Sequence, residues 1–329
     1  MQWLRQSREG LPDHQKKFCV LLYCPEMERV ALEMCALSEG KLRPGEIDWK
    51  TFEDGFPNLF IKNVDSIRGR HVVFLASFLQ HTSLLSQLAV IYALPRYLVK
   101  SLIVVLPYFP TGTMERVDSE GQIATAHTLA TMLSVTPLSS SGPTRLIIYD
   151  IHALQERFYF GGKVVPLLVS AIPTFVAKLH KDHPNEEVAI AFPDEGAHKR
   201  FSSQFASWET IICTKVREGD KRIVSIKEGD VAGKHVFIVD DLVKTGGTLI
   251  QCKEALLKKG AAEVSAFVTH PVFPQESWRR FTNPKEGERP FKVFYITNSC
   301  PEVAEALHGK APFCMISLAS SLVDNTLRY

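Results

Sequence analysis

The sequence predicts an α/β protein with two tandem domains, each built on a mostly parallel sheet flanked by helices. Apolar, strand-like runs alternate with amphipathic, helix-like segments through most of the chain, an order typical of parallel sheets covered by helices on both faces. The 329 residues suffice for about two domains, and the second half of the chain repeats the rhythm of the first. We place the domains at 17–163 and 164–329, after a flexible polar tail at 1–16.

The first half of the chain begins with a short apolar run and a segment that alternates apolar and charged residues at helical spacing. Two alternating runs follow, and they predict paired strands joined by a turn that carries phenylalanines beside an acid. In order, the predicted elements are strand 18–23, helix 25–37, strands 47–52 and 58–64, strand 71–76, helix 81–91, strand 101–106, helix 123–133 and strand 145–149.

The second half repeats this alternation and adds one charged span. We expect the last helix of the chain to pack back on the first domain. In order, the predicted elements are helix 165–179, strand 187–191, helix 199–205, strand 210–215, the charged span 216–230, a strand ending at 239, helix 250–259, strands 263–269 and 291–298, and a final pair of elements near 313–325.

The most informative stretch is 235–249, where an apolar run ends in Asp240 and Asp241 before a Thr-Gly-Gly-Thr loop. The pattern predicts a buried parallel strand, a tight turn and the start of a helix. Glycines let a backbone approach a ligand closely, and the N–H groups at a helix N-terminus favour an anion such as phosphate. Because an ionised carboxylate accepts hydrogen bonds from both hydroxyls of a diol, the two acids suit a sugar. The stretch therefore predicts a sugar-phosphate site.

Four further strands also end in residues that can do chemistry. In parallel sheets, ligands lie at the carboxyl ends of the strands, so these ends predict a shared cleft with the sugar-phosphate stretch. The residues at these ends are Asp150 and His152 after 146–149, the segment 192–196 after 188–191, Lys215 and Arg217 after 211–214, and the segment 107–112 after 102–105.

Composition sets limits on the function. Hydrophobic content of 45% and charged content of 22% are ordinary for a globular protein, and a net charge of +2 gives no reason to expect nucleic acid or an anionic membrane as partner. The seven cysteines are scattered without a Cys-x-x-Cys pair, which predicts reduced thiols rather than a zinc site. The sequence shows neither the apolar core of a signal peptide nor a run long enough to span a bilayer. We expect a cytoplasmic protein.

Several long strings make residues 45–325 resemble ribose-phosphate diphosphokinases, also called phosphoribosyl diphosphate (PRPP) synthases. The resemblance is closer to the plant-type class II form. It implies two phosphoribosyltransferase-like domains with the active site between them. It also implies transfer of a diphosphoryl group from ATP, or another nucleoside triphosphate, to the 1-hydroxyl of ribose 5-phosphate, with Mg²⁺ as cofactor and a homo-oligomeric assembly. The strings are FEDGFPNLF, GRHVVFLASF, VLPYFPTGT, YDIHALQERFYF, AFPDEGAHKRF, CTKVREGDKRIV and IVDDLVKTGGTLI.

The resemblance also implies a role for each motif. Lys215 and Arg217 match a catalytic Lys-x-Arg, whose cations would neutralise charge in the transition state. Ribose 5-phosphate would be bound by Asp240, Asp241, Lys244, Thr245, Gly246, Gly247 and Thr248. The diphosphate loop would be Asp194, Glu195, Gly196 and Ala197. ATP would be bound by Phe52, Asp54, Phe56, Arg116 and His152, and the metal by Asp150, His152 and Asp194. Because Mg²⁺ prefers oxygen, His152 is alternatively a direct donor to a phosphate oxygen.

The chain departs from the class I pattern at three places. Thr113-Met114-Glu115 stand where class I has Arg-Gln-Asp, Gly161 and Val165 stand where acids are found, and Lys244 replaces an acid. The resemblance to class II then implies that ATP is held differently and that inorganic phosphate is not needed for activation. The aromatic turn 52–56 is our candidate for adenine, although a purely structural role for its two rings stays open. Arg157 is a reserve phosphate contact.

Two other functions stay open from the sequence. A transferase that consumes PRPP would share the stretch 235–249, but a single-domain transferase would lack the second domain and the Lys215-x-Arg217 pair. A non-catalytic regulatory subunit of a PRPP synthase would be favoured if Lys215, Arg217 or the Asp240-Asp241 pair were missing, and all of them are present.

Overall fold

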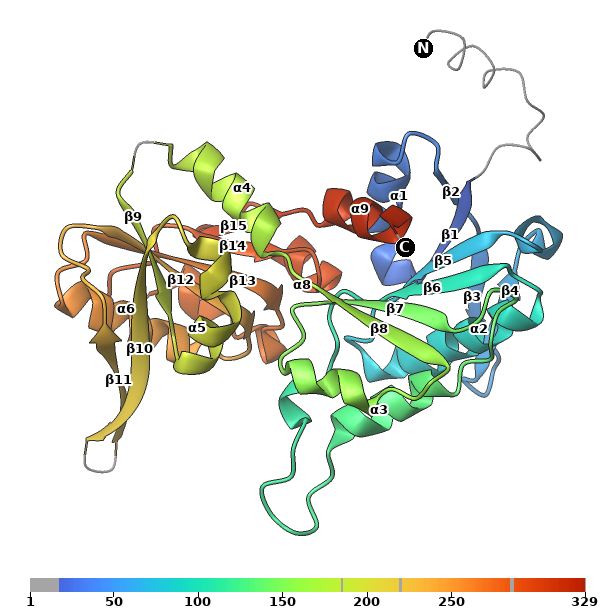
Figure 1. The fold of residues 1–329 in the computed structure, drawn as a ribbon, viewed down its shortest axis with the longest axis horizontal. Coiled ribbons are helices and arrows are strands. Elements are labelled where there is room, and N and C mark those ends of the chain that lie inside the picture. Colours follow the sequence, from blue (N-terminus) through green and yellow to red (C-terminus); the bar gives the residue numbers. More distant parts are fainter. Residues whose placement is uncertain (1–17, 185, 219–220, 285–286, 329) are drawn as a thin grey trace, which may run out of the picture.

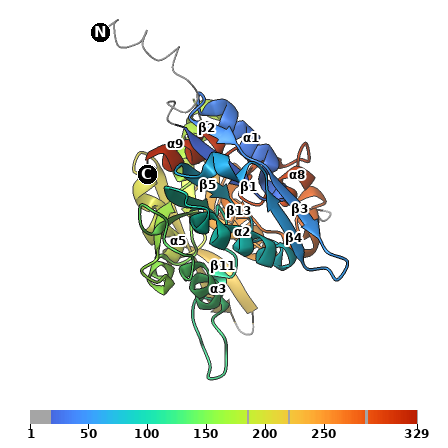
Figure 2. The ribbon, with the colours of Figure 1, turned by 90° about the vertical axis from the view of Figure 1, so that its right-hand side faces the viewer.

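The computed structural model describes residues 18–184, 186–218, 221–284 and 287–328, so the predicted tail lies outside the described residues (Figure 1). In this described part, two parallel-rich sheets lie side by side with helices on their faces, which confirms the predicted α/β class. The first sheet has the strand order β2-β1-β5-β6-β7-β8, and the second has the order β11-β10-β9-β12-β13-β14-β15. A separate hairpin, β3-β4, stands out from the first domain (Figure 2).

The first sheet is parallel throughout. Its central strands are almost completely buried because helices cover both faces, and this explains their continuous valine-, isoleucine- and leucine-rich runs. The elements are β1 (Cys19–Tyr23), α1 (Glu28–Leu37), β2 (Leu42–Pro44), β3 (Ile47–Thr51), β4 (Pro57–Ile61), β5 (His71–Leu75), α2 (Leu84–Arg96), β6 (Ser101–Val105), α3 (Thr125–Ser134), β7 (Thr144–Tyr149) and β8 (Val164–Val169).

The second sheet is parallel except for the ribbon β10-β11 at its edge. In the interior of this sheet, β12 continues past its buried run into the two predicted sugar-binding acids. The elements are α4 (Ile172–Asp182), β9 (Val188–Phe192), α5 (Glu195–Phe201), β10 (Glu209–Glu218), β11 (Lys221–Glu228), β12 (His235–Val243), α6 (Gly247–Lys258), β13 (Glu263–Pro271), α7 (Arg279–Thr282), β14 (Phe294–Thr297), α8 (Pro301–Ala306), β15 (Phe313–Ile316) and α9 (Ala319–Arg328).

The predicted helix 165–179 is wrong in its first part. Residues Val164–Val169 form β8, which pairs with β7 at the edge of the first sheet, and only then does α4 begin. An edge strand tolerates Pro166, which lacks the N–H that an interior strand would need. The first sheet therefore extends six residues past the predicted division at 163/164, and we propose a division between β8 and α4.

The charged span 216–230, for which the sequence predicted no particular element, contains most of an antiparallel ribbon. Strand β10 continues to Glu218 and returns as β11 in an antiparallel ribbon. The side of β11 that faces the sheet carries Val224, which is buried, so a few apolar residues anchor an otherwise charged segment. The sequence prediction also missed β2, α7 and α8.

One hydrophobic core joins the two domains. It runs from Leu21 and Ile103 in the first sheet through Phe175 on α4 to Phe237 and Phe267 in the second. The rings of Phe175 and Phe267 stack with their centroids 4.2 Å apart. The C-terminal helix α9 lies against α1 of the first domain (Figure 1), where Asn325 Nδ2 donates to the Tyr149 hydroxyl at 3.1 Å. The strand ends of both domains are thus held in a fixed relation.

Candidate active site

A cleft of about 480 Å³ lies between the two domains. It is formed by the carboxyl ends of β9 and β12, the start of α6, and the segments that follow β6 and β7 in the first domain. Most of the predicted site residues lie in its wall. These residues are Arg116, His152, Asp194, Gly196, Ala197, Asp240, Asp241, Lys244, Thr245, Gly246, Gly247 and Thr248.

The Thr-Gly-Gly-Thr loop is shaped by a glycine that no other residue can replace without strain. Gly246 has φ +75°, and a Cβ at this position would lie 2.2 Å from Cζ of Phe281. Gly247 has no such constraint, because the nearest atom to its Cβ position is Thr245 Oγ1 at 4.0 Å. Only the first of the two glycines is required by the backbone.

Two side chains that the sequence did not predict as site residues donate hydrogen bonds to the backbone carbonyls of this loop. Ser277 Oγ donates to the Lys244 carbonyl at 2.7 Å, and Arg280 Nη1 donates to the Thr245 carbonyl at 2.8 Å. In a trans peptide the next N–H points opposite to the carbonyl, so these bonds turn the N–H groups of Thr245 and Gly246 away from α7. Helix α6 begins directly afterwards, and the first N–H groups of a helix have no intrahelical partner. N–H groups presented in this way are suited to an anion.

The two acids at the end of β12 have different electrostatic environments. Asp241 Oδ2 accepts a hydrogen bond from His152 Nδ1 at 2.7 Å and lies 3.5 Å from Arg200 Nη1. Burial alone would raise the pKa of Asp241, but His152 and Arg200 outweigh it and hold the pKa below its ordinary value. The same hydrogen bond raises the pKa of His152. Asp241 is therefore an ionised acceptor that links the two domains.

The described influences that raise the pKa of Asp240 are burial and other carboxylates. Burial, the neighbouring carboxylate of Asp241 and that of Asp194 raise the pKa of Asp240 well above its ordinary value. Asp194 caps α5, since its Oδ1 accepts from the Ala197 N–H at 3.0 Å. Repulsion among these carboxylates makes this part of the cleft a place where a divalent cation would be stabilised.

Arg200, on the last turn of α5, is a site residue that the sequence prediction missed. Its side chain is 15% exposed, donates to the His152 carbonyl at 3.1 Å and faces Asp241. It connects the strand ends of β7, β9 and β12. The string AFPDEGAHKRF contained it, but nothing in that string distinguished Arg200 from the adjacent Lys199.

Asp150 does not fit the metal-binding role predicted for it. It is 3% exposed, and its Oδ2 accepts from the Ala171 N–H at 2.9 Å and from Thr269 Oγ1 at 2.6 Å. The carboxylate thus connects the segment before α4 to a side chain of β13 and does not line the cleft. Glu195 also lies outside the cleft wall and pairs instead with Lys227 on β11.

Four other predicted residues lie outside the cleft wall. Phe52 and Phe56 lie on the β3-β4 turn, are 56% and 63% exposed, and do not line the cleft. Asp54 Oδ1 accepts from the Phe56 N–H in the same turn. The exposed Arg157 is also absent from the wall.

Lys215 and Arg217 lie on the β10-β11 ribbon, opposite Val224 and Arg222 in its register. Their side chains lie outside the part of the structure that is described, so their catalytic role stays a prediction.

Two of the three departures from the class I pattern meet at the mouth of the cleft. Lys244 Nζ donates to Thr113 Oγ1 at 2.6 Å, which joins the phosphate loop to the segment of the first domain that follows β6. In the same segment Arg116 Nε pairs with Glu115 Oε1 at 3.0 Å. Below it lies the buried carboxyl of Glu156, whose Oε1 accepts from the Ala153 N–H at 3.0 Å. Burial raises the pKa of Glu156 to about 7.

Taken together, the fold and the cleft are those of a two-domain α/β protein with a polar cleft between its domains. Two family profiles match the chain: "Phosphoribosyl transferase domain" at residues 165–301 and "N-terminal domain of ribose phosphate pyrophosphokinase" at residues 20–136. Ribose-phosphate pyrophosphokinase 4 of Arabidopsis thaliana is 52% identical over 94% of this chain and 92% of its own length. The chain therefore belongs to the ribose-phosphate pyrophosphokinase family, and the predicted resemblance is confirmed.

Two further comparisons agree. A mitochondrial ribose-phosphate pyrophosphokinase 3 of Spinacia oleracea is 50% identical over 97% of this chain and 79% of its own length. The crystal structure of phosphoribosylpyrophosphate synthetase from Mycobacterium smegmatis superimposes with a TM-score of 0.77 at 23% identity, over 95% of this chain and 98% of that one, and so shows the same fold. Among the described residues, no helix is both long and apolar enough to cross a membrane.

Proposed function

We propose that this protein synthesises PRPP by transferring the diphosphoryl group of ATP to the 1-hydroxyl of ribose 5-phosphate, with release of AMP. The observation that carries this proposal is the direct contact between the two halves of the cleft. His152 of the first domain donates to Asp241 of the second at 2.7 Å, so residues assigned to the donor and the acceptor substrates meet at one point.

The acceptor side follows from the loop geometry. The N–H groups of the loop 245–248 and the start of α6 would bind the 5-phosphate, with Lys244 adding a positive charge at the rim. Asp241, kept ionised by His152 and Arg200, would accept hydrogen bonds from the ribose hydroxyls.

Carboxylates that line the cleft fit Mg²⁺ better than the metal ligands predicted from the sequence. Mg²⁺ prefers oxygen ligands, and Asp194 and Asp240 supply carboxylates whose mutual repulsion a cation would relieve. We therefore assign the metal to Asp194 and Asp240 and remove Asp150 from its ligands. When bound, Mg²⁺ would neutralise part of the charge on the diphosphoryl group.

The donor side uses cations from both domains. Arg116 lines the cleft with three quarters of its side chain exposed, and exchanging its ion pair with Glu115 for a triphosphate would keep its charge paired. Transfer of this type demands chiefly positioning and charge neutralisation. We propose that Lys215 and Arg217 on the β10-β11 ribbon neutralise the charge that develops in the transition state.

We further propose that adenine is bound by the exposed 52–56 turn of a second copy of the chain. The turn does not line the cleft of its own chain, whereas its two exposed rings are suited to stack on a base. This assignment requires that the protein form a homo-oligomer. Use of nucleoside triphosphates other than ATP, independence from activating phosphate and a cytoplasmic location likewise stay predictions.

The test is release of AMP by the purified protein from Mg-ATP, with and without ribose 5-phosphate. PRPP is detected by coupling to a phosphoribosyltransferase. We expect AMP and PRPP only when ribose 5-phosphate is present, at equal rates with and without added phosphate. Failure to release AMP from ATP and from other nucleoside triphosphates would leave a regulatory subunit as the explanation. Consumption of added PRPP with a base would instead identify a phosphoribosyltransferase.

A further inference from the structure

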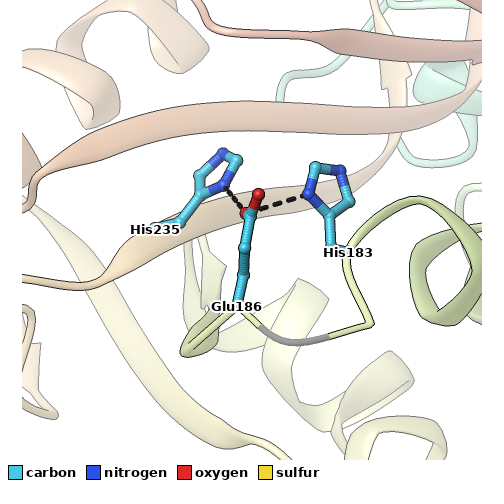
Figure 3. Close-up of side chains that lie close together, drawn as sticks. All are labelled: His183, Glu186 and His235. Carbon is cyan, nitrogen blue, oxygen red and sulfur yellow. Dashed lines mark hydrogen bonds and ion pairs between the residues drawn. The ribbon is translucent and has the colours of Figure 1, made fainter.

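A second polar cluster lies at the opposite end of the second sheet from the cleft. His183 follows α4, Glu186 precedes β9, and His235 is the first residue of β12. In the described part of the chain these three form the one group of His, Cys, Asp and Glu side chains close enough to share a metal ion, with their ligand atoms within 4.8 Å of one another. Figure 3 shows the Glu186 carboxylate between the two imidazole rings.

Both rings turn the same nitrogen toward this carboxylate. Nδ1 of His183 lies 2.9 Å from Glu186 Oε2, and Nδ1 of His235 lies 2.7 Å from the same oxygen (Figure 3). The outward Nε2 atoms have other partners: Tyr295 at 3.2 Å for His183 and Ser265 Oγ at 2.7 Å for His235.

The partners fix the tautomer of His183. The Tyr295 hydroxyl donates a hydrogen bond to Asp182 Oδ2 at 2.6 Å. Because that uses its one proton, the hydroxyl oxygen can only accept from His183 Nε2–H. A neutral His183 then has a lone pair at Nδ1 that faces the carboxylate of Glu186. Two acceptors at this distance repel each other unless a positive charge, either a proton or a metal ion, lies between them.

We propose that the His183, Glu186 and His235 cluster binds a transition-metal ion of the Zn²⁺ type. Imidazole nitrogens favour such ions, whereas Mg²⁺ favours oxygen. Outward hydrogen bonds that hold the imidazoles with one nitrogen inward are the usual support of a metal site, and both histidines have them. The sequence prediction against a zinc site was based on the cysteines alone, and this cluster needs no cysteine.

Metal binding would need the carboxylate to move outward and the two Nδ1 atoms, which lie within 4.8 Å of each other, to close toward the ion. Ligand atoms around a tetrahedral Zn²⁺ lie about 3.3 Å apart, so the two N···O distances of 2.7 and 2.9 Å would open by about half an ångström. Glu186 has a half-exposed side chain on a short loop and can make that movement. The fourth position would be filled by water or by Glu263, whose Oε2 lies 4.0 Å from His235 Nδ1.

The ion would act on the stability of the second domain rather than on the substrates. It would tie the loop after α4 to the start of β12. Asp241 is six residues further along the same strand, about 20 Å away at the rise of a β-strand. Substitutions in the cluster should therefore abolish metal binding without altering the contacts of the cleft.

The test is zinc binding by the full-length protein, freed of metal and held in excess Mg²⁺, in competition with a chromophoric zinc chelator. We expect one Zn²⁺ per chain. Replacing an outer partner of a metal ligand typically costs 10–100-fold in affinity, so Glu186→Gln, which removes a ligand, should weaken binding by at least about 100-fold. Tyr295→Phe should weaken it by about 10-fold. His308→Gln, an exposed histidine outside the cluster, is the matched control.

Co²⁺ absorption gives an independent signature, since a tetrahedral site produces an intense visible band that Glu186→Gln should lose. Zn²⁺ should also raise the Tm of the wild-type protein and leave that of Glu186→Gln unchanged. Equal zinc affinity of the wild type and Glu186→Gln would overturn the proposal. So would loss of binding in His152→Gln alone, which would place the ion in the cleft, and so would purely adventitious binding without the cobalt band.

Discussion

The adjacent glycines of the phosphate loop should respond in opposite ways to the same substitution. In Gly246→Ala, the new Cβ would lie 2.2 and 2.6 Å from Cζ and Cε2 of Phe281. Ordinary carbon contacts are about 3.5–4.0 Å, so the loop or the ring must move by more than 1 Å. In Gly247→Ala, the nearest atom would be 4.0 Å away, and the backbone conformation suits alanine.

The magnitudes follow from two contributions. A left-handed conformation costs alanine about 1–2 kcal/mol, and overpacking against a buried ring adds about 1–3 kcal/mol. Gly246→Ala should therefore lose about 2–5 kcal/mol of stability, which lowers the Tm by about 5–15 °C. A displacement near 1 Å in a binding loop also costs about 100-fold in activity. Gly247→Ala, in the first turn of α6, should stay within about 1 kcal/mol of the wild type.

Thermal unfolding and steady-state kinetics with ribose 5-phosphate measure both effects. The double variant Gly246→Ala/Phe281→Leu should recover part of the lost stability, because leucine has no atom at the Cζ position while the backbone strain remains. Equal Tm and equal KM for the two single glycine variants would refute this reasoning. A double variant whose losses simply add would refute the steric part of it.

Three further predictions concern charged groups. Arg200→Met should lower kcat/KM for ribose 5-phosphate by about 30-fold, because the loss of a charged hydrogen bond costs about 2 kcal/mol. Lys199→Met, at the exposed neighbouring residue, should change kcat/KM little. Equal effects of the two substitutions would contradict the role of Arg200. Lys215→Ala should lower kcat by about 100- to 1,000-fold with a nearly unchanged KM, and loss confined to KM would exclude a transition-state role. The pKa of Glu156 is raised to about 7 in the folded state. Between the ordinary pKa of a glutamate and this value, the folded protein keeps a proton that the unfolded chain has released. The stability of the wild type should therefore fall as the pH rises from about 4.5 to 7. Urea unfolding of Glu156→Gln should show a shallower fall over that range, and parallel pH curves would contradict the shift.

The parts of the site that lie within one stretch of chain could be predicted from the sequence. The run 235–249 specified a strand, two acids, a loop and a helix start, and the structure has all four. Local spacing was enough because the ligand groups follow one another along the backbone. The helix predicted at 165–179 failed for the converse reason: whether an apolar run with Pro166 forms a strand depends on an edge position that only the whole sheet defines.

The contacts that complete the site join residues far apart in the chain. Arg280 and Thr245 are 35 positions apart, and Arg200 and Asp241 are 41 positions apart. No pattern in a single sequence links such pairs, because their proximity comes from the strand order β9-β12-β13 and from the packing of α7. The His183–Glu186–His235 cluster was invisible in the sequence for the same reason.

Diphosphoryl transfer itself is tested most directly by ³¹P NMR of the purified protein with Mg²⁺, ATP and ribose 5-phosphate. Because the β- and γ-phosphates should leave ATP as one unit, we expect AMP and PRPP to rise together in equal amounts, with neither ADP nor free phosphate. Formation of ADP, or release of AMP that does not depend on ribose 5-phosphate, would contradict the assignment of this cleft as the site of PRPP synthesis.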